Sequence, residues 1–158
     1  MFKKFNKIIL NERKECRVCG GSIKHIADFG NIHINDFPED PDFSRGVAPM
    51  VLDQCEECQL VQMRHTVDPK ILYGEHYWYE SGLNKKLKDN LLEIATYGNE
   101  NTEPGDIVLD IGANDGTLLS GIEHDRYRIG CEPAPNLIRK LSKECDAVIN
   151  DMLSLIHI

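Results

Sequence analysis

The chain has 158 residues, of which 28% are charged and 41% are hydrophobic, a composition typical of globular proteins rather than of disordered chains. The net charge of −8 argues against a general nucleic-acid binder. The basic first ten residues lack the apolar core of a signal peptide, and no later run is long enough to span a membrane. We therefore expect a cytoplasmic protein with reduced cysteines and without a nucleic-acid or membrane partner.

Two Cys-x-x-Cys pairs, Cys16 with Cys19 and Cys55 with Cys58, are separated by 35 residues. Such turns direct two thiolates each at one point, and four thiolates in a tetrahedron suit Zn²⁺. A disulfide pair is the alternative, but the expected compartment disfavours it. A redox site is also disfavoured, because neither pair opens a helix after a strand. The prediction is a closed zinc site that stabilises a fold and performs no chemistry.

Each cysteine pair needs a sharp turn behind it. Gly20 suits the left-handed conformation of such a turn, whereas Gln59 occupies the equivalent place in the second pair. Between the pairs lies a polar, proline-rich insert, and short strands are expected at about residues 25–29, 50–54 and 60–63. The other two cysteines, Cys131 and Cys145, are expected to be core or partly buried thiols.

The connecting region after the second pair contains a short helix, an aromatic run and a longer helix. Asp68 and Pro69 suit the N-cap and first position of a helix through residue 73. Residues 77–84 are the most aromatic run of the chain. Apolar positions then recur every three or four residues, which predicts an amphipathic helix that packs on a sheet and ends at a glycine; the positions are Leu83, Leu87, Leu91, Ala95 and Gly98.

The last third of the chain begins with an apolar strand, a glycine-bearing turn at residues 112–116 and a helix expected from residue 117. A second strand is expected over residues 126–132, then a helix near 137–141 and a third strand from 147. This order predicts a doubly wound parallel α/β sheet, whose ligands bind beyond the carboxyl ends of the strands. Asp110 and Glu132 lie at the first two strand ends, 22 positions apart, and the second is placed to hold ribose hydroxyls.

This arrangement resembles the S-adenosylmethionine site of class I methyltransferases, in which the first acid and glycine contact the methionine–sugar part and the second acid holds the ribose. The resemblance implies that the donor-binding residues are Asp110, Gly112, Asn114, Asp115 and Glu132. A nicotinamide-binding domain is the runner-up, but Asn114 replaces the second glycine of its Gly-x-Gly-x-x-Gly motif. An ordinary strand–helix turn with unrelated acids is the remaining alternative.

Residues 14–65 resemble the zinc-binding N-terminal domain of sugar C-methyltransferases, which modify deoxysugars carried on nucleotides. The matching strings are Cys-Arg-x-Cys-Gly at 16–20, Asn35-x-Phe37, and Cys-x-x-Cys-x-Leu-Val-Gln at 55–62, followed by Val-Asp-Pro at 67–69. The resemblance implies that Asn35 and Phe37 help to seat the nucleotide, although Phe37 as a packing residue is an equal alternative. It also implies a catalytic tyrosine in the Tyr-x-Tyr-x-Ser string, which we assign to Tyr79, with Tyr77 as the other candidate and a packing role as the alternative.

The expected fold is thus α/β, with a four-cysteine zinc module of short strands at 1–66, a connector at 67–105 and a partial Rossmann-like methyltransferase sheet at 106–152. Such a sheet needs five or more strands, so we expect an N-terminal fragment that is inactive by itself and binds the donor weakly at most. Residues 153–158 resemble translated adaptor sequence and are expected to be a non-native tail.

The predicted function is S-adenosylmethionine-dependent C-methylation of a nucleotide-linked deoxy or keto sugar, with Zn²⁺ as a structural cofactor. A stand-alone zinc-ribbon binding module, or another small-molecule class I methyltransferase, is the alternative. The sequence does not determine the oligomeric state.

Overall fold

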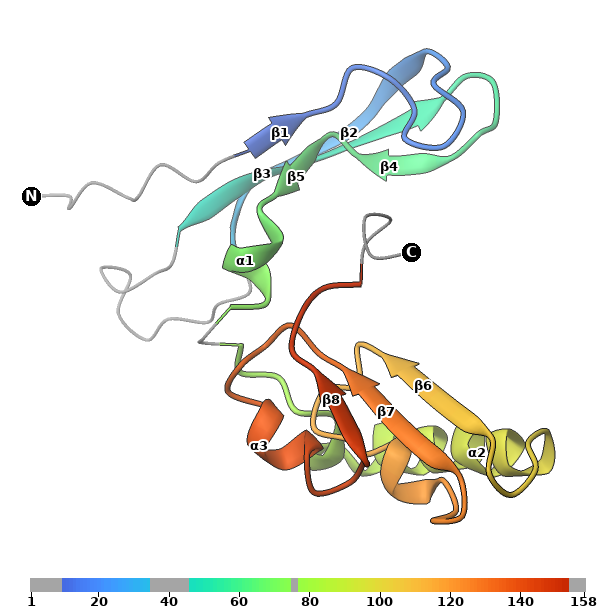
Figure 1. Ribbon diagram of the computed structural model, residues 1–158. Coiled ribbons are helices and arrows are strands. Elements are labelled where there is room, and N and C mark those ends of the chain that lie inside the picture. The colour runs from blue at the N-terminus through green and yellow to red at the C-terminus, as the bar shows by residue number, and fades with distance from the viewer. Residues whose placement is uncertain (1–9, 35–45, 75–76, 154–158) are drawn as a thin grey trace, which may run out of the picture. The chain divides into compact units, whose positions relative to one another are not determined.

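The computed structural model describes residues 10–34, 46–74 and 77–153, which form two compact units, Met1–Leu72 and Tyr73–Ile158 (Figure 1). Each unit is described separately below. Asn35, Phe37 and the predicted tail from residue 154 onward lie outside the described residues.

The first unit consists of two small antiparallel sheets. The larger sheet has the order β2-β3-β4, formed by β2 (Ile23–His33), β3 (Val47–Cys55) and β4 (Val61–Met63). The smaller sheet pairs β1 (Leu10–Glu12) with β5 (His65–Val67). The three predicted strands are present, and the first two are longer than expected because their pairing continues from Ile23 opposite Cys55 to His33 opposite Val47.

A buried ion pair ties the two sheets of the first unit together. Asp53 on β3 is 1% exposed and accepts hydrogen bonds from Arg64 Nε at 2.8 Å and Nη2 at 2.6 Å. Arg64 lies between β4 and β5, so the pair fixes where the chain passes from one sheet to the other. Hydrogen bonding to Arg64 lowers the pKa of Asp53, in spite of its burial.

The predicted short helix follows as α1 (Pro69–Leu72). Asp68 Oδ1 accepts a hydrogen bond from the Lys70 N–H at 2.9 Å, which confirms the expected cap. None of the helices in the described ranges has the length and apolar character that crossing a bilayer requires.

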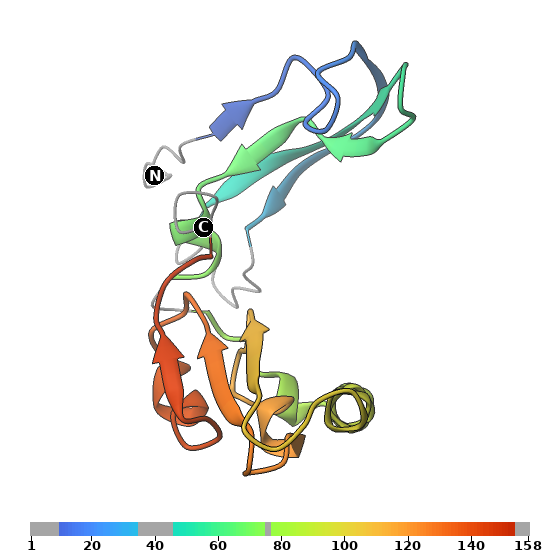
Figure 2. The same cartoon turned by 45° about the vertical axis from the view of Figure 1, so that its right-hand side comes forward.

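The second unit contains a parallel sheet with the order β6-β7-β8, formed by β6 (Ile107–Ile111), β7 (Tyr127–Cys131) and β8 (Ala147–Ile149). One face of this sheet packs on α2 (Lys85–Glu100), η3 (Leu119–Gly121) and α3 (Ile138–Leu141), as can be followed in Figures 1 and 2. The buried cluster on that face is Ala95, Ala113, Leu119, Ile122 and Leu141, with Val108 and Val148 against it. The three parallel strands and their helices confirm the predicted partial Rossmann-like sheet.

The other face of the parallel sheet is apolar and, within the described residues, largely exposed. Alternate residues of β6 point to it, because side chains alternate along a strand. Its exposed members are Ile107, Leu109, Ile111, Tyr127 and Ile149.

Helix α3 lies directly on β7. A Cβ atom built on Gly130 would come within 2.6 Å of Leu141 Cδ1 and 2.9 Å of Leu141 Cδ2. Gly130 therefore sets the distance between this helix and the sheet, because protein interiors are close-packed.

Two helix predictions require correction. The helix expected from residue 117 is a single 3₁₀ turn, η3. Asp115 Oδ1 accepts the Thr117 N–H at 3.2 Å, as a helix cap does, but the chain leaves the helical path at Ile122, whose φ of −79° and ψ of 134° are extended. Leu83 is 79% exposed and is not part of the apolar stripe. It lies in η2 (Ser81–Leu83), since the side chain of Asn84 accepts the Leu87 N–H and caps α2 after it.

The predicted end of α2 is also wrong. The helix continues past Gly98 to Glu100. A Cβ on Gly98 would lie 3.1 Å from Ile122 Cδ1. The glycine therefore permits close packing on the loop after η3 and does not act as a cap.

Leu119 and Leu83 differ sharply in burial. Leu119 is fully buried, so Leu119→Ala is expected to lower the free energy of unfolding of the second unit by about 2–5 kcal/mol, through lost burial and a residual cavity. Leu83→Ala, the matched control at an exposed site, should change it by no more than about 0.5 kcal/mol. Urea denaturation followed by the fluorescence of Trp78, the single tryptophan, measures both. Equal effects would contradict the assigned core.

Candidate metal centre and ligand pocket

The four predicted cysteine ligands come together in the first unit. Their sulfur atoms all lie within 4.8 Å of one another, with Cys16 to Cys58 at 3.6 Å and Cys19 to Cys55 at 3.5 Å. Four Zn–S bonds of about 2.3 Å in a tetrahedron place the sulfurs about 3.8 Å apart. The cluster therefore fits a zinc ion with all four positions filled by protein.

Backbone geometry shapes both cysteine turns. In the first, the Gly20 N–H donates to Cys16 O at 3.0 Å, and Gly20 has the expected left-handed φ of 74°. In the second, Gln59 adopts a φ of 63° without being glycine, and its side-chain amide donates to Glu56 O at 3.0 Å. The N–H groups of Glu57 and Cys58 both point at Cys55 Sγ, at 3.4 Å. The Cys55 sulfur therefore accepts two backbone hydrogen bonds from its own turn.

The thiols differ in acidity. Backbone N–H groups at Cys19 and Val18 lower the pKa of Cys16 to about 6. For Cys19, the Gly21 N–H also lowers the pKa, but the neighbouring Cys55 and Cys58 thiols, together with burial, outweigh it and raise the pKa to about 12. Four thiolates therefore do not coexist here without a compensating charge, which a divalent cation supplies.

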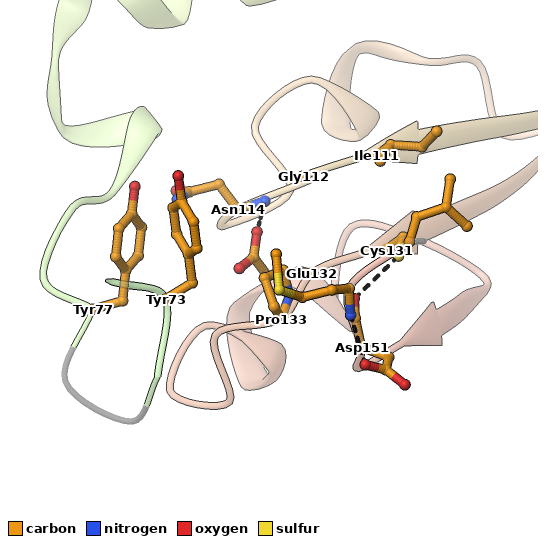
Figure 3. A pocket seen from close by; sticks show the side chains of 11 residues that line it. Tyr73, Tyr77, Ile111, Gly112, Asn114, Cys131, Glu132, Pro133 and Asp151 are labelled. Atoms are coloured by element: carbon orange, nitrogen blue, oxygen red, sulfur yellow. Dashed lines mark hydrogen bonds between the residues drawn. The ribbon is translucent and has the colours of Figure 1, made fainter. Parts of the chain in front are cut away.

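A pocket of about 320 Å³ lies beyond the carboxyl ends of β6, β7 and β8, where a ligand is expected in a sheet of this kind (Figure 3). Four chain segments line it: two tyrosines before α2, the turn after β6, the end of β7 and the segment after β8. The lining residues are Tyr73, Tyr77, Ile111, Gly112, Asn114, Cys131, Glu132, Pro133, Asp151, Met152 and Leu153. Gly112 has a φ of 79°, and a Cβ on it would meet nothing within 4 Å, so its backbone stands open to a ligand.

Glu132 is a fixed acid in the wall of this pocket. It is 4% exposed, and its Oε2 and Oε1 accept the N–H groups of Asn114 at 2.9 Å and Ala134 at 2.8 Å. Asn150 Nδ2 bonds to its carbonyl oxygen at 2.8 Å. A carboxylate has about four lone-pair positions, so two acceptor positions are left for a ligand.

Asp110 lies at the end of β6 but is not among the residues that line the pocket. Burial and the negative charge of Glu132 raise the pKa of Asp110. The two strand-end acids therefore repel each other electrostatically, and a bound cation would relieve this repulsion.

The side chains of Asn114 and Asp115, which were predicted to bind the donor, are engaged by the segment before α2. Asn114 bonds to Tyr79 O and to the Ser81 N–H, and Asp115 Oδ2 accepts the Gly82 N–H at 2.8 Å.

The structure distinguishes the two candidate tyrosines. Tyr77 lines the pocket, and burial raises its pKa. Tyr79 does not line it, and its ring packs edge-on against Trp78 with the ring centroids 5.8 Å apart. The geometry thus favours Tyr77 as the tyrosine that faces a ligand, while the catalytic role of Tyr79 stays a prediction.

The sequence interpretation missed the pocket residues Tyr73, Asp151 and Met152. Asp151 follows β8 as Glu132 follows β7, so the repeated pattern of an acid just after a strand was an available signal. Cys131 was expected to be a buried thiol, and it donates to Asp151 O at 3.3 Å.

Comparisons with known proteins agree with both parts of this description. Residues 16–73 match the family described as "Putative zinc binding domain". Over 130 residues the chain is 29% identical to "C-methyltransferase NovU" of Streptomyces niveus. The chain is therefore similar to a zinc-binding domain family over its first unit, and to a C-methyltransferase over most of its length. The matched stretch makes up 78% of this chain and 31% of that relative, so the chain spans less than two thirds of the relative's length.

The cysteine cluster leads to a direct test. Purified without added metal, the protein should contain close to one zinc per chain by elemental analysis. Cys55→Ser removes one thiolate, and the first unit should lose zinc and become sensitive to protease, because metal binding and folding are coupled. Cys145→Ser is the control, since that thiol lies in the second unit and donates to Leu141 O. A zinc-free wild type, or a Cys55→Ser protein with full zinc and full protease resistance, would refute the assignment.

Proposed function

We propose that this chain provides the zinc module and the donor-binding site of an S-adenosylmethionine-dependent C-methyltransferase that acts on a nucleotide-linked sugar. The observation that carries the proposal is the pocket beyond three parallel strands, with an open glycine turn on one side and the fixed Glu132 carboxylate on the other. The relative named as a C-methyltransferase supports the reaction class.

The pocket residues suit the chemistry of the donor. A ribose presents two hydroxyl donors, and Glu132 retains two acceptor positions for them. Ile111 and Met152 offer an apolar surface to a flat base. The negative field of Asp110 and Glu132 favours the positive charge on the sulfur of the donor. At about 320 Å³, the pocket is at the lower end of the range for small-molecule sites.

When bound, the donor supplies an activated methyl group, so the protein's task is to orient the reactants and to manage a proton. Methylation at carbon next to a keto group requires removal of the carbon-bound proton and stabilisation of the resulting negative charge. Among the described pocket residues, Tyr77 offers a hydroxyl for hydrogen bonding to a substrate. The raised pKa of Tyr77 keeps this hydroxyl protonated, so it acts as a donor rather than as a base at neutral pH.

The sequence of the first unit is the basis for proposing a nucleotide-linked sugar as the substrate. Its two cysteine turns and the Leu-Val-Gln string after the second resemble the corresponding domain of sugar C-methyltransferases. A zinc module with all positions filled by sulfur has no open coordination site for chemistry. Its contribution is therefore structural. The first unit provides a stable surface that is available to bind the part of the substrate that does not react.

The two acids provide the test. Binding of S-adenosylhomocysteine to the 158-residue chain, measured by ligand-observed NMR into the millimolar range, should be saturable. Glu132→Gln should weaken it by about 1.5–3 kcal/mol, or roughly 10- to 150-fold, because a hydrogen bond to a charged group is lost. Asp110→Asn should weaken it less, because Asp110 does not line the pocket and the sulfur of this ligand is uncharged. Glu93→Gln, which changes an exposed acid on α2, is the matched control. Absence of saturable binding, or equal affinity of all three variants and the wild type, would favour the alternative of a zinc-ribbon binding module.

Binding should also depend on pH in a defined direction. Because the pKa of Asp110 is raised in the ligand-free protein, protonation begins above the usual aspartate range as the pH falls. Protonation removes the charge that attracts the cationic donor. The affinity for S-adenosylmethionine should therefore fall on acidification, and it should do so less in Asp110→Asn. A pH profile identical in the variant and the wild type would contradict this role.

A further inference from the structure

Residues 77–83, here called the aromatic segment, run beside the pocket and are held by polar contacts from three other parts of the second unit. Asn136 Nδ2 donates to Tyr77 O at 2.7 Å, and Lys140 forms an ion pair with Glu80. Asp115 accepts the Gly82 N–H. The Tyr77 N–H also donates to Gly74 O at 3.0 Å. Asn114 makes two further contacts with the segment, and it is singled out because the same residue also bonds to Glu132.

Both polar atoms of the Asn114 amide bond to the aromatic segment. Its Oδ1 accepts the Ser81 N–H at 2.9 Å, and its Nδ2 donates to Tyr79 O at 3.1 Å. The residue is 8% exposed, so these bonds form in a site largely shielded from water. Although Asn114 contributes to the pocket wall, its two polar side-chain atoms serve the protein backbone.

The backbone of the same residue contacts the pocket acid. The Asn114 N–H donates to Glu132 Oε2 at 2.9 Å, as the dashed line in Figure 3 shows. A left-handed φ of 52° places the residue in a turn that satisfies the carboxylate and the aromatic segment together. Asparagine tolerates this conformation better than most residues with a side chain.

We propose that Asn114 is a positioning residue: it links the Glu132 carboxylate to Tyr79 and Ser81 and thereby fixes the path of the aromatic segment beside the pocket. It acts through its neighbours and does not bind the donor through its amide. This inference rests on the proposed function only in taking the pocket as the donor site. A ligand that engages Glu132 then shares its carboxylate with the Asn114 N–H, and the aromatic segment responds.

The sharpest variant is Asn114→Gly. Glycine retains the backbone N–H that bonds to Glu132 and adopts a positive φ without strain, so only the amide is removed. Asn136→Ala is the matched control, because it also removes an asparagine amide bonded to a carbonyl of the aromatic segment but leaves the Asn114 link intact. Circular dichroism and zinc content establish that both variants are folded.

Two measurements on the ligand-free, 158-residue chain decide the positioning role. In Asn114→Gly, hydrogen exchange of the Ser81 amide should accelerate, whereas the Leu87 amide, bonded to Asn84, should keep its protection. Acrylamide quenching of Trp78, the single tryptophan and a member of the aromatic segment, should increase. In Asn136→Ala the Ser81 amide should remain protected. Wild-type exchange and quenching in Asn114→Gly would overturn the proposal.

A third measurement adds the ligand. Saturating S-adenosylhomocysteine should change Trp78 quenching in the wild type and in Asn136→Ala, and this response should be lost in Asn114→Gly. A response that persists in Asn114→Gly would overturn the link through Asn114. If the wild type binds no ligand, the proposed function fails, while the ligand-free exchange and quenching still decide whether Asn114 positions the segment.

Discussion

The second unit depends on the hydrogen bonds made by one buried carboxylate. Glu132 follows β7 and accepts N–H groups from the turn after β6 and from its own loop, so it joins the ends of two neighbouring parallel strands. The open backbone at Gly112 and the amide of Asn114 are therefore held at fixed positions relative to the sheet. Each carboxylate oxygen has its own backbone donor, and burial strengthens those hydrogen bonds.

The first unit also depends on a small number of specific contacts, at the cysteine cluster and at one ion pair. Few of its side chains are fully buried, so the four sulfur atoms and the Asp53–Arg64 pair provide much of the long-range contact that fixes its fold. The left-handed Gln59 shows that the second cysteine turn is imposed by the cluster and not by local preference, since a glycine there would be less strained.

Features with a fixed sequence spacing could be predicted. The cysteine pairs, the strand order of the parallel sheet and the acids at strand ends all follow from local pattern and connectivity. The exposed Leu83 could not be predicted, because the choice between a helix start at 83 or at 85 depends on whether Asn84 or an earlier residue caps the helix. The short η3 was missed because its early end, at the extended Ile122, leaves no signal in the hydrophobic pattern.

Which of Tyr77 and Tyr79 lines the pocket could not be predicted from the sequence, for another reason. Two tyrosines separated by one residue project differently according to the path of the backbone. That path is set by Asn114 and Asn136, which lie more than thirty residues further along the chain. Long-range polar contacts of this kind leave no periodicity in the sequence.

The close approach of α3 to β7 has a consequence for how such a protein can diverge. Leu141 packs directly on the backbone of Gly130. Asn136 lies just before α3 and Lys140 lies within it, and both bond to the aromatic segment. A single added methyl group at position 130 would therefore act as a wedge under the helix and shift both residues away from the aromatic segment. Pocket-lining side chains can be exchanged one at a time as a substrate changes. Position 130, in contrast, is restricted to glycine, because the packing of α3 on β7 leaves no room for a side chain.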